Sequence, residues 1–236
     1  MVVTSHKRFD YLKRTLTSFF ETNDYPLEKI IVIEDSDDAR VLELPTLFPG
    51  QPLEIVLNGN NLGQRASIDK AYALVDTEYI YHCEEDWFFG RAGIIAESMA
   101  ILEAEPNTLM VLARTEKNMP KYIKSLSVQQ AGVARYRRIG PKVHYRWYTF
   151  SFNPGLRRKS DWLSIDGGYA SIDDHEMGLS QHFKSAGRDM AWLVNGQVEH
   201  IGTDTTHTNK LPITKSERIG IWLQSLRRKY AHYLRM

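Results

Sequence analysis

Residues 79–89 read Tyr-Ile-Tyr-His-Cys-Glu-Glu-Asp-Trp-Phe-Phe. It begins as a short run of β-branched and aromatic residues, which is typical of a strand inside a sheet. It then becomes acidic at Glu84, Glu85 and Asp86. Neighbouring carboxylates raise one another's pKa and oppose ionisation together unless a cation lies beside them. Mg2+ or Mn2+, bound partly by a substrate's phosphates, would supply that charge; the alternative is a solvated acidic turn.

The composition is that of an ordinary globular protein. The chain has 236 residues, 42% of them hydrophobic, enough for one large α/β domain or two small ones. Its 30 lysines and arginines balance 29 acids, which predicts no general affinity for nucleic acid. The single cysteine, Cys83, excludes an internal disulfide and a multi-cysteine metal site. We find no membrane-length apolar run and no signal peptide after Met1, so we expect a cytoplasmic protein, with peripheral contact at the inner face of the membrane as an extension.

The chain before residue 79 predicts further strands and helices. Residues 2–8 form a very short strand that runs into a polar loop, and apolar residues between 9 and 20 recur at helical spacing. Residues 29–33 are a continuous apolar run, the pattern of a strand buried on both faces, and acids follow it at 34–38. A strand over residues 53–57 ends in a loop rich in asparagine and glycine. Ligands bind at the carboxyl ends of such strands in nucleotide-binding sheets.

The loops after these strands also disfavour two classes of protein. The first strand is followed by no glycine-rich dinucleotide fingerprint and no P-loop lysine, which argues against a dinucleotide oxidoreductase and a P-loop kinase. A helix is predicted to open at Gln64 and Arg65. An arginine near a helix start is unfavourable for the helix dipole unless it faces an anion such as a pyrophosphate. The other interpretation of Arg65 is an ordinary exposed side chain.

Four motifs resemble, in their order and spacing, the nucleotide-sugar half of a GT-A glycosyltransferase, most closely family 2. They are a polar loop at residues 3–8, an acidic loop at 34–37, an asparagine-x-glycine helix start at 61–63 and an acidic metal motif at 84–86. The first loop lacks the family's proline, and Glu84 stands where the family has aspartate. The resemblance covers about the first 90 residues. It implies an α/β GT-A fold, in which a Rossmann-like nucleotide half with a mostly parallel central sheet flanked by helices precedes an acceptor-binding half.

The resemblance implies roles for the residues of these motifs. Asp35 would read the base, Thr4 and Arg8 would line the nucleoside pocket, and Asp86 would hold Mn2+ or Mg2+ on the diphosphate. The implied donor is a nucleoside-diphosphate sugar, with uridine diphosphate as the family's expected carrier. The donor-binding residues implied in full are Thr4, Ser5, His6, Arg8, Glu34, Asp35, Asn61, Gly63, Arg65, Glu84, Glu85 and Asp86.

The middle of the chain carries weaker signals. We expect a helix over residues 91–105, a strand over 109–112, and a strand over 147–152 followed by a turn at 153–156. Residues 115–146 are basic and look irregular. They are either a mobile loop that folds over an anionic substrate or a solvated basic face. Three aromatic side chains would stack on a sugar ring if they are exposed and otherwise belong to the core: Trp147, Tyr148 and Trp162.

Three acids lie at the start of a helix that Gly187 is predicted to end: Asp173, Asp174 and Glu176. Helix capping and the helix dipole favour acids at this place, so a purely structural role is open. The resemblance implies a second role, because inverting family 2 enzymes carry here the general base that deprotonates the acceptor hydroxyl. Asp174 aligns best with that base, Asp173 is its neighbour, and Glu176 is the reserve.

A histidine follows a predicted strand at residues 191–194. His200 resembles the histidine that many GT-A enzymes place on the metal or the pyrophosphate, and a neutral imidazole is a suitable Mn2+ ligand. His207 is the weaker alternative, and a plain surface histidine is the third interpretation. The implied metal ligands are therefore Asp86, Glu84 and His200.

The C-terminal residues 215–236 predict a basic amphipathic helix. Such a helix lies on an anionic membrane surface, or packs on the protein's own core or on a second subunit, which would make the protein an oligomer. The sequence has no repeats and no linker-like segment. We therefore expect one GT-A domain over residues 1–236, with a nucleotide half at 1–90 and an acceptor half at 91–214.

Together these features predict a metal-dependent inverting glycosyltransferase of the hexosyltransferase type. It would move a sugar to a hydroxyl of a glycan, a lipid-linked acceptor or a protein. By analogy with family 2 enzymes of this size, it would serve the synthesis of surface polysaccharide, lipopolysaccharide or another glycoconjugate. A nucleotidyltransferase acting on sugar phosphates is one alternative, although its usual glycine-rich loop is missing from residues 4–8. A non-catalytic nucleotide-sugar-binding module is the other.

Overall fold

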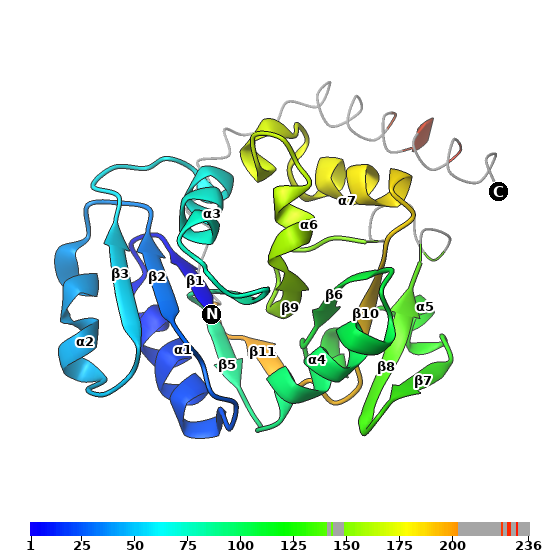
Figure 1. Ribbon diagram of the computed structural model, residues 1–236, viewed down its shortest axis with the longest axis horizontal. Coiled ribbons are helices and arrows are strands. Elements are labelled where there is room, and N and C mark those ends of the chain that lie inside the picture. Colours follow the sequence, from blue (N-terminus) through cyan, green and yellow to red (C-terminus); the bar gives the residue numbers. More distant parts are fainter. Residues whose placement is uncertain (141–142, 144–148, 203–222, 224–225, 228–229, 231–236) are drawn as a thin grey trace.

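A nine-stranded sheet forms the centre of the molecule (Figure 1). The computed structural model describes residues 1–140, 143, 149–202, 223, 226, 227 and 230. In chain order the strands of the sheet are β1 (Val2–Ser5), β2 (Ile30–Glu34), β3 (Leu53–Leu57), β4 (Tyr79–Glu84), β6 (Thr108–Leu112), β7 (Val128–Ala131), β8 (Ala134–Ile139), β9 (Gly155–Arg158) and β10 (Asp189–Leu193). In space they lie in the order β3-β2-β1-β4-β9-β6-β10-β8-β7. Among these strands β8 and β9 run opposite to the rest, so the sheet is mostly parallel, as predicted.

The first four strands form the expected Rossmann-like half. β1 pairs in parallel with β2 and with β4, and β2 pairs in parallel with β3. Three connections make the crossovers: α1 (Phe9–Thr22) joins β1 to β2, η1 (Ala39–Glu43) with α2 (Leu44–Leu47) joins β2 to β3, and α3 (Gln64–Ala73) joins β3 to β4. Because all four strands run the same way, the polar loops that follow them meet at one edge of the sheet.

Helices cover both faces of this sheet. On one face α1, α2 (Leu44–Leu47) and α4 (Ile94–Ala104) bury their apolar side chains against residues such as Val3. On the other face α3 and α7 (His175–Ser185) pack against residues such as Val2. Val2 and Val3 point to opposite faces and both are fully buried, which is why the strand reads as a continuous apolar run.

The prediction of a strand over residues 147–152 and a turn over 153–156 is wrong for the part that the structure describes. Residues 149–152 are not a strand, and β9 begins at Gly155, where the turn was expected. β9 lies between β4 and β6 and pairs antiparallel with both. Tertiary pairing on two sides therefore overrides the local turn propensity of Asn153, Pro154 and Gly155. A Cβ on Gly155 would lie 2.3 Å from the carbonyl oxygen of Val111, so a side chain does not fit there.

The basic segment at residues 115–146 is also more regular than predicted. It contains α5 (Lys121–Lys124) and the hairpin of β7 and β8, and β8 pairs antiparallel with β10. Arginines within β8 obscured its strand pattern. Arg138, for example, donates to Asp189 at 2.5 Å and so satisfies its charge inside the sheet. Neither the mobile-loop interpretation nor the basic-face interpretation anticipated this hairpin.

The remaining described elements are short. The strands β5 (Trp87–Phe89) and β11 (Val198–His200) form a separate two-stranded sheet. The others are α6 (Lys159–Leu163) and the 3-10 turns η1 (Ala39–Glu43), η2 (Glu116–Asn118) and η3 (Tyr169–Ser171). The described positions of the predicted C-terminal helix are helical, namely Leu223, Leu226, Arg227 and Tyr230. The rest of residues 203–236 lies outside the described residues, as do Trp147 and Tyr148. Within the described parts of the chain, no helix has the length and hydropathy needed to cross a membrane.

Candidate active site

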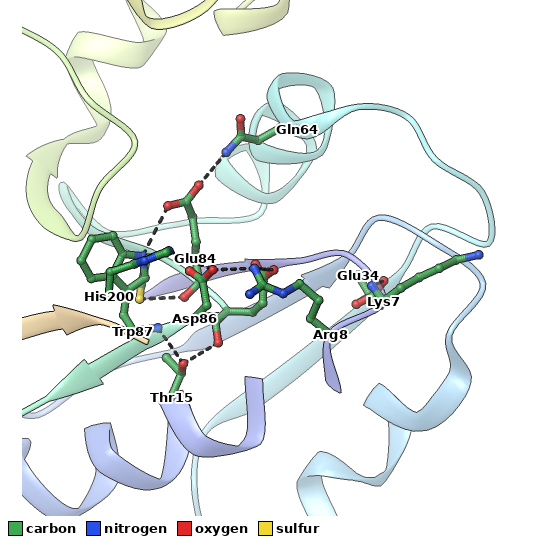
Figure 2. Close-up of polar contacts among 11 residues, drawn as sticks. Lys7, Arg8, Thr15, Glu34, Gln64, Glu84, Asp86, Trp87 and His200 are labelled. Carbon is green, nitrogen blue, oxygen red and sulfur yellow. Dashed lines mark hydrogen bonds and ion pairs between the residues drawn. The ribbon is translucent and has the colours of Figure 1, made fainter. Parts of the chain in front are cut away.

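The acidic turn lies at the carboxyl end of β4, beside the ends of β1 and β2 (Figure 2). Thr15 on α1 holds this turn from below. Its hydroxyl donates to the carbonyl oxygen of Glu85 at 2.5 Å and accepts from the backbone N–H of Trp87 at 3.0 Å. Thr15 is fully buried, so both bonds are shielded from water. The helix that crosses from β1 therefore fixes the direction in which the three acids point.

Arg8 supplies positive charge to two of these acids. Its Nη1 atom donates to Asp86 Oδ2 at 2.5 Å and to Glu85 Oε1 at 3.1 Å. The loop after β1 and the turn after β4 are thereby tied together across 78 residues of sequence. Paired charges that are only partly exposed interact more strongly than surface pairs, because solvent screens them less.

Glu84 points away from Arg8, toward Gln64 and Trp87 (Figure 2). Gln64 Nε2 donates to Glu84 Oε1 at 2.8 Å, and the Trp87 indole N–H donates to Oε2 at 3.3 Å. Burial, followed by the charges of Glu85 and Asp86, raises the pKa of Glu84 to about 8. Burial and the charge of Asp86 raise the pKa of Glu85 to about 7. Glu84 therefore holds a proton at neutral pH in the absence of a bound cation.

The small sheet of β5 and β11 brings His200 to the acidic turn. His200 lies opposite Trp87 in this ladder, and the next N–H, of Ile201, donates to the carbonyl oxygen of Asp86 at 2.9 Å. His200 Nε2 lies 3.1 Å from Asp86 Oδ2. A Cβ on Gly202 would lie 2.3 Å from the same Oδ2 atom, so the backbone closes directly over the carboxylate. The structure thus brings together the aspartate and the histidine that the sequence predicted as metal ligands.

Asp86 and His200 fit a divalent cation as a two-ligand set. One carboxylate and one imidazole suit Mn2+, and Mg2+ is usually held by one or two carboxylates together with substrate phosphates. Over the described residues, no group of three or more His, Cys, Asp or Glu side chains is arranged to hold a metal. A bound ion would therefore take its other ligands from a diphosphate and water. Glu84 is bonded to Gln64 and Trp87 instead, and His207 lies outside the described residues.

Asp35 shapes the loop that leads to α3. Its carboxylate accepts from the backbone N–H groups of Leu62 at 2.7 Å and Gly63 at 2.9 Å, and from Asn58 Nδ2 at 3.0 Å. Gly63 has a φ of +91°, a backbone angle that residues with a side chain rarely adopt. Asn61 Oδ1 also accepts from the Gly63 N–H, at 2.8 Å. The predicted base-reading acid is therefore also the anchor of the asparagine-glycine loop.

Glu34, at the end of β2, is buried, whereas His6, just after β1, is half-buried. Glu34 is fully buried, and its Oε1 atom accepts from the Lys7 backbone N–H at 2.9 Å and from the Ser36 hydroxyl. It supports the loop from beneath and does not line the pocket described next. His6 Nδ1 donates to the carbonyl oxygen of Asp35 at 2.8 Å, which places the proton on Nδ1 and leaves Nε2 for another partner.

Two pockets adjoin each other over these strand ends. The first, of about 310 Å3, is lined by Thr4, Ser5, His6, Asp35, Asn61, Gly63, Gln64, Ser67, Glu84 and Glu85. The second, of about 490 Å3, is lined by Gln64, Glu84, Phe150, Phe152, Asp174, His175, Glu176 and Met177. Gln64 and Glu84 line both pockets, so these two side chains form the wall between them.

The predicted acids at the start of α7 separate in the structure. Asp174 and Glu176 line the second pocket, and Asp173 does not. Asp174 makes no side-chain capping bond to α7, although it is the N-cap residue. Asp174 and His175 both have left-handed backbone, with φ of +66° and +49°, a strained conformation that is concentrated at functional sites. Glu176 Oε1 accepts from the Phe152 N–H at 2.6 Å, so it also holds the pocket wall.

Sequence reasoning placed Arg65 near a pyrophosphate and did not single out Thr15, Gln64 or Asp69. In the structure Arg65 donates to the carbonyl oxygens of Tyr169, at 3.4 Å, and of Ile172. A signal for Gln64 was available, because it directly follows the asparagine-x-glycine motif. Asp69 is four residues after Arg65, on the same helix face. Thr15 carries no sequence signal, since its partners are backbone atoms about 70 residues away.

The fold is that of the GT-A glycosyltransferases. S. aureus TarS 1–349 in complex with UDP-GlcNAc is similar with a TM-score of 0.65 and 13% identity, over 90% of this chain and 61% of that chain. Mannosyltransferase PcManGT from Pyrobaculum calidifontis, in complex with GDP-Man and Mn2+, has a TM-score of 0.61 and 12% identity, over 99% of this chain and 63% of that chain. At such identities the likeness concerns the fold alone. The present chain spans about three fifths of the length of these two.

The family follows from the sequence model rather than from these structures. The model of glycosyl transferase family 2 matches residues 1–170, and the chain therefore belongs to this family. The match includes all four motifs of the nucleotide half and confirms the resemblance that they carry. Comparison of the sequence with curated proteins gives no match.

Proposed function

We propose that this protein transfers a sugar from a nucleoside-diphosphate sugar to a hydroxyl acceptor. The observation that carries the proposal is the pair of adjoining pockets divided by Gln64 and Glu84. One pocket opens over the ends of β1 and β2, where nucleotides bind in such sheets, and the other faces Asp174. The transferred sugar would lie at the shared wall, within reach of an acceptor in the second pocket.

Uridine diphosphate is the proposed carrier. The TarS neighbour was solved with UDP-GlcNAc and the mannosyltransferase with GDP-Man, so both uracil and guanine carriers occur on this fold. In this chain Asp35 would act on the base through the loop that it anchors, and His6 Nε2 would offer a hydrogen-bonding atom to it. Thr4, Ser5 and Asn61 line the same pocket and would contact the nucleoside.

Asp86 and His200 would hold Mn2+ or Mg2+. When bound, the ion supplies positive charge to the departing diphosphate. The Mn2+ in the mannosyltransferase structure supports a divalent ion for this fold. Arg8, which is held by Glu85 and Asp86, would bring a second positive group toward the phosphate oxygens.

Asp174 would act as the general base. It would accept the proton of the acceptor hydroxyl while that oxygen forms a bond to the anomeric carbon. The nucleoside diphosphate would leave from the opposite face with the electron pair of the broken bond, so that the anomeric configuration inverts. Phe150 and Phe152 line the same pocket and offer apolar surface to a sugar ring. Glycan, lipid-linked and protein hydroxyls are the acceptor classes we propose, within surface polysaccharide or other glycoconjugate synthesis.

A ligand screen tests the donor site. We would measure thermal unfolding with UDP, GDP, CDP and ADP, each with and without Mn2+. A ligand at 100 times its Kd stabilises the native state by about 2.7 kcal/mol. We expect a shift with one diphosphate that depends on Mn2+ and is lost in Asp86→Ala. Glu21→Ala, at an exposed position on α1, is the matched control and should keep the shift.

The screen, together with assays of pyrophosphate release and of sugar transfer, separates the three functions considered. No shift with any diphosphate, or an undiminished shift in Asp86→Ala, contradicts the proposed donor site. Release of pyrophosphate from a nucleoside triphosphate and a sugar phosphate would identify a nucleotidyltransferase. Binding of a nucleotide sugar without transfer or hydrolysis would identify a binding module.

A further inference from the structure

Helix α3 contacts both halves of the candidate site. Gly63, just before α3, and Gln64, its first residue, line the donor pocket. One turn further along, α3 lies beside the chain that links α6 to α7 (Figure 1). We call residues 167–172 of that chain the hinge segment; they lead directly to Asp174.

Asp69 on α3 binds the hinge segment through its backbone. Asp69 Oδ1 accepts from the N–H of Tyr169 at 2.8 Å, and Oδ2 accepts from the N–H of Ala170 at 2.8 Å. Oδ1 also accepts from the indole N–H of Trp162 at 2.7 Å. One carboxylate thus satisfies two successive backbone donors at the start of η3, and a charged acceptor makes these bonds stronger than neutral ones.

Arg65 binds the same segment through its carbonyl oxygens. Its Nη1 atom donates to the carbonyl oxygens of Ile172 and, at 3.4 Å, of Tyr169. Arg65 and Asp69 are four residues apart on α3, so they present their side chains on one face. The Arg65 guanidinium therefore binds carbonyl oxygens of the segment, and the Asp69 carboxylate binds its N–H groups. This explains why an arginine stands near a helix start without facing an anion.

Gly168 permits this close approach. Its φ is +71°, and a Cβ at this position would lie 2.7 Å from Asp69 Cγ and Oδ1. The adjacent Gly167 also has a left-handed φ, of +76°. The hinge segment therefore packs closely against the Asp69 side chain, in a backbone conformation that favours glycine.

From these contacts we infer that Asp69 and Arg65 are positioning residues for the general base. The inference rests on the proposed function, because it assumes that Asp174 accepts the acceptor's proton. Neither residue lines either pocket, so both act through the hinge segment. Asp173, Asp174 and His175 are exposed, and Asp174 and His175 have left-handed backbone directly after the segment that Asp69 and Arg65 bind. The same helix that forms the wall of the donor pocket thereby sets the place of the base relative to the donor.

Asp69→Asn is the decisive variant, because asparagine keeps one acceptor oxygen and replaces the other with an NH2 donor, which faces a backbone N–H of the segment and loosens its hold. We expect the kcat of sugar transfer to fall by about tenfold to a hundredfold, since small displacements of a reacting group have such effects. The Kd for the nucleoside diphosphate should change by less than about twofold, because the donor pocket is untouched. Hydrogen exchange at Tyr169 and Ala170 should become faster. Asp166→Asn is the matched control, being an exposed aspartate beside the same segment.

Each outcome decides the inference. Unchanged kcat in Asp69→Asn, or unchanged exchange at the hinge segment, overturns it, as does an equal loss in Asp166→Asn. If Asp69→Asn does not fold, Trp162→Phe removes only one of the three bonds and should give a smaller loss of kcat in the same direction; no loss overturns the inference. If the wild-type protein transfers no sugar, the proposed function fails, and the exchange measurement still decides whether Asp69 holds the segment.

Discussion

Glu84 lies beside two other acids, Glu85 and Asp86, and this environment makes the stability of the protein depend on pH. Burial and the charges of Glu85 and Asp86 raise its pKa from the ordinary 4.5 to about 8, and Glu85 is raised to about 7. At pH values above 4.5 and below these raised pKa values, Glu84 and Glu85 keep protons in the folded protein that they have released in the unfolded chain. The free energy of unfolding therefore falls as the pH rises through this range.

We expect the metal-free protein to lose thermal stability between about pH 5 and pH 8, for the reason just given. Glu84→Gln cannot ionise, so its unfolding temperature should depend less on pH, and at pH 8 it should be more stable than wild type by as much as about 4 kcal/mol. Calorimetry across this pH range would measure both effects. Glu103→Gln, at an exposed site on α4, is the control and should follow wild type. A Glu84→Gln curve parallel to wild type would contradict the raised pKa.

Asp174→Asn tests the assigned base. Loss of a general base costs about 10²- to 10⁴-fold in rate, so we expect kcat to fall by that factor with the donor Kd unchanged. Asp173→Asn is the matched control, because Asp173 is exposed and lies outside the second pocket. Steady-state rates with a saturating donor would measure the difference. Full turnover by Asp174→Asn, or a larger loss in Asp173→Asn, means that the base has been assigned to the wrong residue.

At the scale of the elements, α1 orients the acidic turn through one hydroxyl. The crossover helix was predicted as an amphipathic element that buries its apolar face. Its buried Thr15 has a different task, because it pairs with two backbone groups of the turn after β4. The position of the turn thus depends on a helix from the start of the chain.

Thr15→Val keeps the shape of the side chain and removes these two bonds. The N–H of Trp87 would be left buried without a partner, which costs about 1–3 kcal/mol. We expect the urea midpoint to fall accordingly, with an unchanged slope of the transition. The control is Thr17→Val, because the Thr17 hydroxyl only donates to its own helix at Lys13. Equal stabilities of the two variants would refute the role given to Thr15.

On the scale of the whole molecule, the two halves share one sheet. β9, from the acceptor half, pairs with β4 of the nucleotide half and with β6, so no boundary separates the halves within the described strands. That the chain forms a single domain stays a prediction, which cooperative unfolding would test.

We therefore expect one cooperative unfolding transition. Trp87 belongs to the nucleotide half by sequence and contacts His200 and Arg114 of the acceptor half, so it reports on the junction between the halves, whereas Trp162 and Trp192 lie in the acceptor half. Tryptophan fluorescence of wild type and of Trp87→Phe, together with circular dichroism, should give the same urea midpoint after allowance for the stability change of the variant. Two separate midpoints would mean that the halves unfold independently.

The sequence alone determined the nucleotide half and the composition of its site. β1, β2 and β4 are short runs that are buried over most of their length and β3 is a half-buried edge strand, and all four were predicted from their local patterns. The carboxyl ends of parallel strands meet at one edge of the sheet, so the acidic loops after β2 and β4 were expected at the same edge. The family resemblance added His200 and Asp174, which the structure places against Asp86 and in the adjoining pocket.

Which side chains join the two halves depends on tertiary packing. β9 forms where local propensity indicates a turn, because pairing on both edges outweighs it. The hydrogen bond from Gln64 to Glu84 joins residues 20 positions apart, and the hydrogen bond from the Tyr169 N–H to Asp69 joins residues 100 positions apart. Such contacts depend on how helices and loops pack against the finished sheet, and a pattern read along the chain holds no information on distances of that kind.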